Sequence, residues 1–265
     1  MPSALKCLLF AGIFSLGGCM SAPTGPVAPP TVVVAVAADL QYAFEEMMLD
    51  FHRVHPDVVV RPTFGSSGTL FSQISNNAPF DVFLAADVEY VKRLADMELI
   101  DRTSLFVYGE SQLVIWVRED SSLPIDQEGI KVLLDPRVKK ISIADPKHSP
   151  YGRAAQELLN TTKLADQVAS KLVLGENAAQ SAQLVENGSA NVGIIAKSLA
   201  LSPPLRAFGK FAEVPKNSFK TMIQGGGIMT NAKDRASCEK LLDYITSPRG
   251  RTILSEYGLR PPKED

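Results

Sequence analysis

Short β-branched apolar runs alternate with segments of helical periodicity along most of this chain, and this alternation constrains the fold more than any other feature. Residues 31–36 form an almost continuous apolar run, which is typical of a strand that is buried on both faces. Residues 41–55 follow with apolar side chains at helical spacing. Because strands that alternate with helices build parallel sheets with helices on both faces, we predict an α/β fold.

A second set of alternating strands and helices begins after Gly109, and no low-complexity linker separates it from the first set. The chain is therefore predicted to pass between two lobes along extended segments near 106–112 and 216–224. Two adjacent crossings form a hinge, and ligands of such sheets lie where the strands end and the helices begin. Lobe I is expected to comprise residues 32–109 and 221–265, and lobe II residues 110–220.

The N-terminus has the features of a targeting segment. Lys6 precedes an apolar run over 7–16, which is too short to span a bilayer. The run ends in Leu-Gly-Gly-Cys at Cys19, which resembles a bacterial lipobox. This resemblance implies a signal peptide over 1–19, a lipid on Cys19 and a location in the periplasm or at the cell surface. An ordinary secretory signal is the alternative. The proline-rich residues 20–31 are predicted to form an extended tether.

Composition excludes several classes of function. The formal net charge is −2, so neither nucleic acid nor an anionic membrane surface is an expected partner, and membrane contact is expected through the lipid anchor only. If Cys7 leaves with the signal and Cys19 is acylated, Cys238 has no partner for an intramolecular disulfide. His52 and His55 have no third candidate metal ligand nearby.

Two strand-to-helix junctions carry the strongest functional signal. One apolar run ends at small residues before a helix begins near Asp39, and the next ends similarly before Ser66 and Ser67. The first N–H groups of a helix have no intrahelical acceptor and lie at the positive end of its dipole. Two such ends that meet at one point form an anion site that needs no cationic side chain.

These two junctions belong to a set of six segments that occur in a defined order along the chain. The segments are Ala37–Leu40, Phe64–Leu70, Phe80–Asp87, Asp145–Gly152, Gly175–Ala178 and Asn191–Ala196. Together they resemble the molybdate-binding receptors of bacterial ABC transporters, from about Thr31 to the C-terminus. The resemblance implies a two-lobed periplasmic-binding-protein fold (type II-like), each lobe a mainly parallel sheet flanked by helices. It also implies a non-catalytic monomer without a cofactor, which binds molybdate or tungstate and delivers it to a membrane permease.

The resemblance also assigns the molybdate contacts. In lobe I they fall on Asp39 and Ser67. Asp39 is expected to turn inward as a helix cap, since its carboxylate would repel a dianion, whereas Ser67 is expected to donate from its hydroxyl and its amide. In lobe II the contacts fall on Tyr151, Ala178 and Ala196. Ala178 offers only its backbone N–H. Ala196 stands where many relatives have a tyrosine, which makes the phenol of Tyr151 a candidate substitute.

The sequence is also compatible with other functions. A receptor for another oxyanion or a small organic acid is the main alternative, and Arg153 would favour a carboxylate ligand. A secreted hydrolase needs a nucleophile and a base, and the sequence has no Gly-x-Ser-x-Gly elbow. An adhesion or sensor module with the same fold is the third alternative. We therefore expect a binding protein rather than an enzyme.

Overall fold

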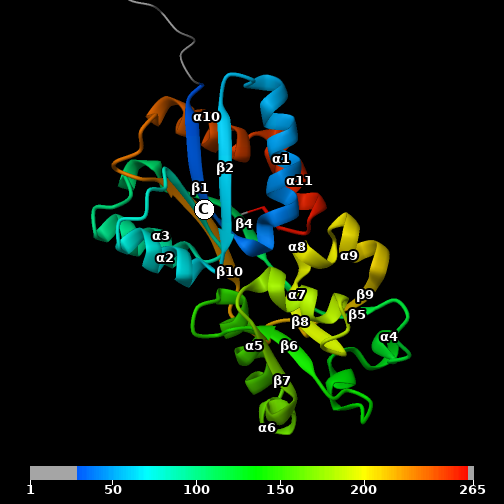
Figure 1. Ribbon diagram of the computed structural model, residues 1–265. Coiled ribbons are helices and arrows are strands. Elements are labelled where there is room, and N and C mark those ends of the chain that lie inside the picture. Colours follow the sequence, from blue (N-terminus) through cyan, green and yellow to red (C-terminus); the bar gives the residue numbers. More distant parts are fainter. Residues whose placement is uncertain (1–28, 262–265) are drawn as a thin grey trace, which may run out of the picture.

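The computed structural model describes residues 29–261, so the predicted signal peptide, Cys19 and most of the tether lie outside the described residues. The first sheet consists of β1 (Thr31–Ala37), β2 (Val59–Gly65), β3 (Val82–Ala85), β4 (Phe106–Ser111) and β10 (Met222–Ile228). The second consists of β5 (Leu113–Arg118), β6 (Ile141–Ala144), β7 (Leu172–Gly175), β8 (Val192–Ala196) and β9 (Gly209–Glu213). Figure 1 shows the two sheets in separate lobes, the first in the upper lobe and the second in the lower.

The strand orders are β2-β1-β3-β10-β4 and β7-β6-β8-β5-β9. β1 is parallel to β2 and β3, and β6 is parallel to β7 and β8. β10 and β5 instead pair antiparallel with both of their neighbours. These two strands lie beside the crossings, where the chain enters a sheet from the other lobe. The predicted α/β fold of two helix-flanked sheets is confirmed, and each sheet is mixed.

Predicted helix starts near Asp39 and Ser67 are confirmed, and further helices join these two on the first sheet. Together they are η1 (Ala38–Leu40), α1 (Gln41–Val54), α2 (Ser67–Ser75), α3 (Val88–Asp96), η2 (Arg102–Ser104), α10 (Arg235–Thr246) and α11 (Pro248–Glu256). The Ser66 hydroxyl accepts from the N–H of Thr69 at the start of α2, and the Asp87 carboxylate accepts from the N–H of Glu89 at the start of α3. Such side-chain caps satisfy otherwise unpaired N–H groups and fix where a helix begins.

The second sheet carries several very short helices. The helices are α4 (Ile125–Glu128), η3 (Gly129–Leu134), α5 (Pro150–Thr161), α6 (Ala165–Val168), η4 (Ala169–Lys171), α7 (Ala178–Glu186), α8 (Lys197–Ala200) and α9 (Pro203–Phe208). Helices α6, α8 and α9 have no counterpart in the sequence prediction, because one or two turns are too short to establish an apolar period.

The two crossings lie side by side. β4 and β5 are separated by Gln112 alone, and residues 214–221 lead from β9 back to β10. β10 pairs with β4 through Met222 and Ser111, next to the point where both segments leave the first lobe. This arrangement is the paired connection that a hinge between lobes requires.

Each lobe has its own apolar core. Trp116 is fully buried in the second lobe, and Phe44 in the first. Cys238 is a buried free thiol on α10.

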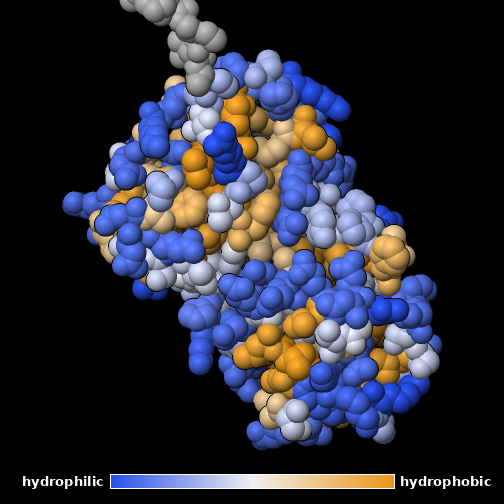
Figure 2. All heavy atoms as spheres, in the orientation of Figure 1, coloured by the Kyte–Doolittle hydropathy of each residue, from blue (hydrophilic) through white to orange (hydrophobic). Residues whose placement is uncertain are grey.

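Within residues 29–261, no helix combines the length and apolar character that a membrane span needs. Figure 2 shows a mostly hydrophilic surface, with apolar side chains gathered between β2 and α1, where Met48 and Val60 line a groove.

Candidate functional site

The two lobes meet at the start of α1, whose first turns point toward α7 and α8 in Figure 1. The Tyr151 hydroxyl of α5 donates to Oδ2 of Asp39 at 2.7 Å. Ser198 of α8 donates from its hydroxyl to the Asp39 carbonyl oxygen at 2.9 Å. All three residues are buried. Residues of lobe I and lobe II therefore share one desolvated contact at the place where the sequence predicts the ligand.

Three helix starts lie near this contact, since α7 packs against η1 and the N–H of Gly68 in α2 donates to the carbonyl of His148, just before α5. Ser67 and Ala178 are the first residues of α2 and α7, and Tyr151 is the second residue of α5. Among the residues that the structure describes, no acceptor is paired with the backbone N–H of these three residues. Helix starts with unpaired N–H groups carry partial positive charge, so this region attracts an anion.

Ser67 is buried, and its hydroxyl has a hydrogen left to donate. The Ser67 Oγ accepts from the N–H of Ala86 at 2.9 Å, which fixes the hydroxyl against the end of β3. The cap of α2 is provided by the neighbouring Ser66 instead. A hydroxyl that is held as an acceptor in this way still has its own proton for a ligand.

The predicted cap at Asp39 is wrong. Ala37 and Leu40 precede η1 and α1, and neither helix start has a side-chain cap. Asp39 lies inside η1, and its Oδ2 accepts from Tyr151 and, at 2.6 Å, from Nε2 of Gln224. A buried carboxylate needs donors around it, and these two side chains supply them. Its carboxylate therefore stays in the site rather than turning away from it.

Ala178 begins α7 and Ala196 directly precedes α8, and both of these helices contact η1, which contains Asp39. Both belong to a buried apolar cluster that also includes Tyr151 and, from lobe I, Ala37 and Ala86. Ala196 ends β8 and supplies no polar side-chain atom. Asn177 caps α7 by accepting from the N–H of Gln180. The structure thus brings all five predicted residues to one interlobe region.

Sequence reasoning missed the polar residues on the hinge strands. Gln224 in β10 is fully buried, and its Nε2 also lies close to the Ser111 hydroxyl of β4 and 3.0 Å from the Tyr151 hydroxyl. Both side chains come from the strands that form the crossings. The available signal was a lone glutamine inside the otherwise apolar segment Met222–Ile228.

Basic side chains do not enter this cluster. Among the buried polar side chains of residues 29–261, none is a lysine or an arginine. Arg153 instead lies at the rim, where its guanidinium contacts the Asp87 carboxylate at 3.2 Å and the Tyr90 hydroxyl at 3.0 Å. A pocket of about 130 Å³ lies at the same rim, lined by both lobes.

The environment shifts the two titratable groups of the cluster. Burial raises the pKa of Asp39 from 3.8 to about 6, although the hydrogen bonds from Gln224 and Tyr151 limit the rise. Burial also raises the pKa of Tyr151 well above 10, and the nearby Asp39 charge adds to this effect. The phenol therefore stays protonated at neutral pH and acts as a hydrogen-bond donor.

Two hinged α/β lobes that enclose polar helix starts define a solute-binding protein. A family model described as bacterial extracellular solute-binding protein matches residues 32–260. The chain belongs to this family, and because its members are solute-binding proteins, the expectation of a non-enzyme is confirmed.

The most similar relatives point in the same direction. The molybdate-binding protein of Azotobacter vinelandii is 34% identical over 86% of this chain and 88% of its own length. A Bacillus subtilis protein whose name describes an ABC transporter substrate-binding lipoprotein is 26% identical over 86% of this chain and 85% of its own. The solved structure of the Azotobacter vinelandii periplasmic molybdate-binding protein superposes with a TM-score of 0.82, with 25% identity, covering 88% of this chain and all of that one.

Proposed function

We propose that this protein works outside the cytoplasm, where it binds molybdate, and also tungstate, between its lobes and delivers the anion to the membrane permease of an ABC transporter. The observation that carries this proposal is that buried residues begin α2, α5 and α7 beside the interlobe contact of Tyr151 with Asp39, with no buried lysine or arginine among residues 29–261. The molybdate-binding relative from Azotobacter vinelandii, similar over most of both chains, supports the choice of ligand.

The donors of the site explain its selectivity for a fully ionised tetrahedral anion. Molybdate presents only acceptors, and the N–H groups of Ser67, Tyr151 and Ala178 with the Ser67 hydroxyl present donors. Hydrogen phosphate would bring an O–H that none of these donors accepts, and it is disfavoured wherever that O–H does not reach the carboxyl of Asp39. Sulfate is also fully ionised but smaller. Its hydrogen bonds to donors that are spaced for molybdate would be longer and therefore weaker. Neutral donors also allow release when the lobes open.

The proposal is tested by titration calorimetry of the soluble chain, purified without added oxyanion, with molybdate, tungstate, sulfate and phosphate. Molybdate and tungstate are expected to bind with similar affinity and at least tenfold more tightly than sulfate or phosphate. Equal affinity for molybdate and sulfate would refute the selectivity, and binding of a carboxylic acid in their place would support the organic-acid alternative. Analytical ultracentrifugation is expected to show a monomer.

The proposal includes a lipid anchor at Cys19, which lies outside the described residues. The lipobox-like sequence before Cys19 and the proline-rich tether support it. In bacterial cells the wild-type chain is expected in the membrane fraction and a Cys19→Ser variant in the soluble or uncleaved precursor pool. A Cys19→Ser chain that is processed and fractionates like the wild type would contradict lipidation and leave an ordinary secretory signal.

A further inference from the structure

The buried carboxyl of Asp39 is a second chemical feature of the site, because it is an acidic group where an anion is to bind. Its Oδ2 accepts from Tyr151 and Gln224, but its Oδ1 is buried without a hydrogen-bond partner in the described residues. Oε1 of Gln224 is likewise buried and unpartnered within residues 29–261. The unpartnered Oδ1 shows that the Asp39 carboxyl lacks one hydrogen-bond donor among the described residues.

A count of hydrogens shows the consequence for a ligand. Tyr151 has one hydroxyl hydrogen, and the 2.7 Å contact directs it to Asp39. While Asp39 is ionised, the phenol therefore has no hydrogen for an oxyanion, and the free Oδ1 offers only lone pairs. A bare dianion also offers only lone pairs. One added proton on the carboxyl resolves the conflict, since Asp39 then donates and the repulsive charge is removed.

Among residues 29–261, no lysine or arginine is buried beside Asp39 to keep its carboxyl ionised next to a dianion. The phenols of Tyr151 in α5 and Tyr108 in β4 are the titratable groups whose pKa values respond to the Asp39 charge. From α8, Ser198 contacts only the Asp39 carbonyl, and Lys197 pairs with Glu213. From α1, Tyr42 packs in the neighbouring cores. The α7 start contributes uncharged residues, Asn177 and Ala178.

We propose that each fully ionised oxyanion is bound together with one proton, which the Asp39 carboxyl takes from solvent, and that Asp39 thereby sets the affinity of the site. The inference rests on the proposed function, because it concerns the same oxyanion. Burial already raises the pKa of Asp39 to about 6, and a dianion nearby raises it further. The bound dianion adds two negative charges and the proton adds one positive charge, so the net charge of the site becomes more negative by one.

The test is calorimetry with molybdate between pH 6.5 and 8.5, repeated at each pH in buffers of different ionisation enthalpy. The buffer dependence gives the number of protons taken up. For the wild-type chain we expect close to one proton per molybdate at pH 8 and an affinity that falls by about tenfold per pH unit above pH 7.

Asp39→Asn is the informative variant, because it keeps the shape and the acceptor for Tyr151 and replaces Oδ1 by a donor. It is expected to take up no proton, to lose the pH dependence and to bind molybdate at least tenfold more tightly than the wild type at pH 8. Asp39→Ser is a second variant without an ionisable group, and it is also expected to take up no proton.

Asp81→Asn is the control, since Asp81 is buried in lobe I and accepts from the N–H groups of Val33 and Lys233, away from the site. It should keep the wild-type proton uptake.

The outcomes separate the two proposals. Molybdate binding by the wild type with no proton uptake and a flat pH profile overturns the role of Asp39 and leaves the proposed function intact. Proton uptake that persists in Asp39→Asn also overturns it. Absence of molybdate binding by the wild type and both Asp39 variants overturns the proposed function, and the inference with it. The wild-type measurement needs no variant, so a variant that fails to fold does not prevent the test.

Discussion

Arg153 and Asp87 form an ion pair across the two lobes, with Nη2 of Arg153 3.2 Å from Oδ2 of Asp87. Arg153 lies in α5 of lobe II, and Asp87 caps α3 of lobe I. The pair therefore forms only when the lobes are closed. Its side chains are 42% and 30% exposed, so water and salt screen it.

Arg153→Gln is accordingly expected to weaken oxyanion binding only slightly, by less than about fivefold, since partly exposed ion pairs contribute roughly 0–1 kcal/mol. The effect should shrink in high salt. Calorimetry of Arg153→Gln, Asp87→Asn and the double variant measures the coupling between the two residues. If Arg153→Gln abolished binding at all salt concentrations, Arg153 would be a ligand-binding residue and the organic-acid alternative would gain support.

Ser67→Ala removes a buried hydroxyl that has a hydrogen to donate. Loss of such a donor to a charged ligand is expected to weaken molybdate binding by about 1–3 kcal/mol, or roughly 5- to 150-fold. Ser72→Ala is the matched control, because Ser72 lies on the exposed face of the same helix. An unchanged affinity in Ser67→Ala would remove the Ser67 hydroxyl from the site.

Much of the fold follows from local signals in the sequence. Helix α1 is indicated by buried residues at helical spacing, including Phe44, Met47 and Phe51. Helix α11 is indicated by Pro248 at its start and Gly258 after its end. These signals come from residues that are close together in the sequence, so they are visible without tertiary information. The five contact residues were assigned from the resemblance to the molybdate-binding receptors. Four of them lie in the first turn of a helix, which local signals also indicate, and Ala196 is the last residue of β8.

The polar cluster was not predictable, because it depends on residues far apart in the sequence. Gln224 and Asp39 are 185 positions apart and meet only because β10 returns from the second lobe. Local reasoning assigned Asp39 to the commonest role of an aspartate near a helix start, which is capping. The donors Tyr151 and Gln224 changed this outcome by offering the carboxylate a buried alternative.

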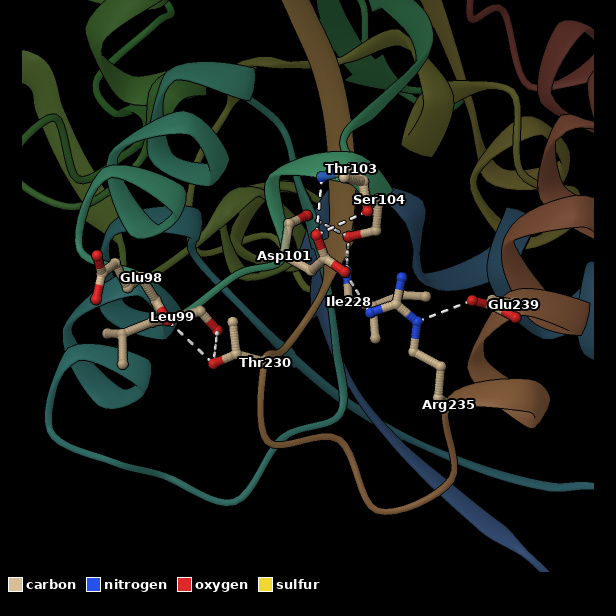
Figure 3. Close-up of polar contacts among 9 residues, drawn as sticks. All are labelled: Glu98, Leu99, Asp101, Thr103, Ser104, Ile228, Thr230, Arg235 and Glu239. Carbon is tan, nitrogen blue, oxygen red and sulfur yellow. Dashed lines mark hydrogen bonds and ion pairs between the residues drawn. The ribbon is translucent and has the colours of Figure 1, made fainter.

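Asp101 is expected to make folding depend on pH at the acidic end. Figure 3 shows its carboxylate between Thr103 and Arg235, and Oδ1 accepts from the Thr103 hydroxyl at 2.7 Å and its N–H at 2.9 Å. These bonds and the Arg235 guanidinium lower the pKa of Asp101 from 3.8 to about 2. Because the folded pKa is depressed, the stabilisation is present above about pH 4 and is lost as the pH falls toward 2.

Asp101→Asn should therefore lower the melting temperature slightly at pH 7, and the difference from the wild type should disappear as the pH approaches 2. Thermal unfolding followed by circular dichroism at several pH values measures this. Asp243→Asn, at an exposed position of α10, serves as the control and should match the wild type throughout. A difference between Asp101→Asn and the wild type that grows at low pH would contradict the assigned direction of the pKa shift.

Gly68 allows the backbones of the two lobes to approach each other. Its N–H donates to the His148 carbonyl of lobe II at 2.9 Å, and a Cβ at this position would lie 2.5 Å from that oxygen and 3.0 Å from the Tyr90 hydroxyl. The close atom is backbone, so it is not free to rotate away. The clash with the His148 carbonyl exists only in the closed arrangement, because His148 belongs to the opposite lobe, whereas the Tyr90 hydroxyl is the far end of a side chain of the same lobe.

Gly68→Ala is therefore expected to prevent full closure and to lower molybdate affinity at least fivefold, given the roughly 1–3 kcal/mol typical of overpacking. The melting temperature without added oxyanion should change little, since the open protein accommodates the methyl group. Gly65→Ala is the matched control, because its Cβ would meet only the flexible Leu70 side chain of its own lobe at 3.2 Å. Small-angle X-ray scattering with molybdate should show a larger radius of gyration for Gly68→Ala than for the wild type. Equal radii and equal affinities would show that closure does not bring Gly68 and His148 together, and the interlobe site would then have to be placed elsewhere.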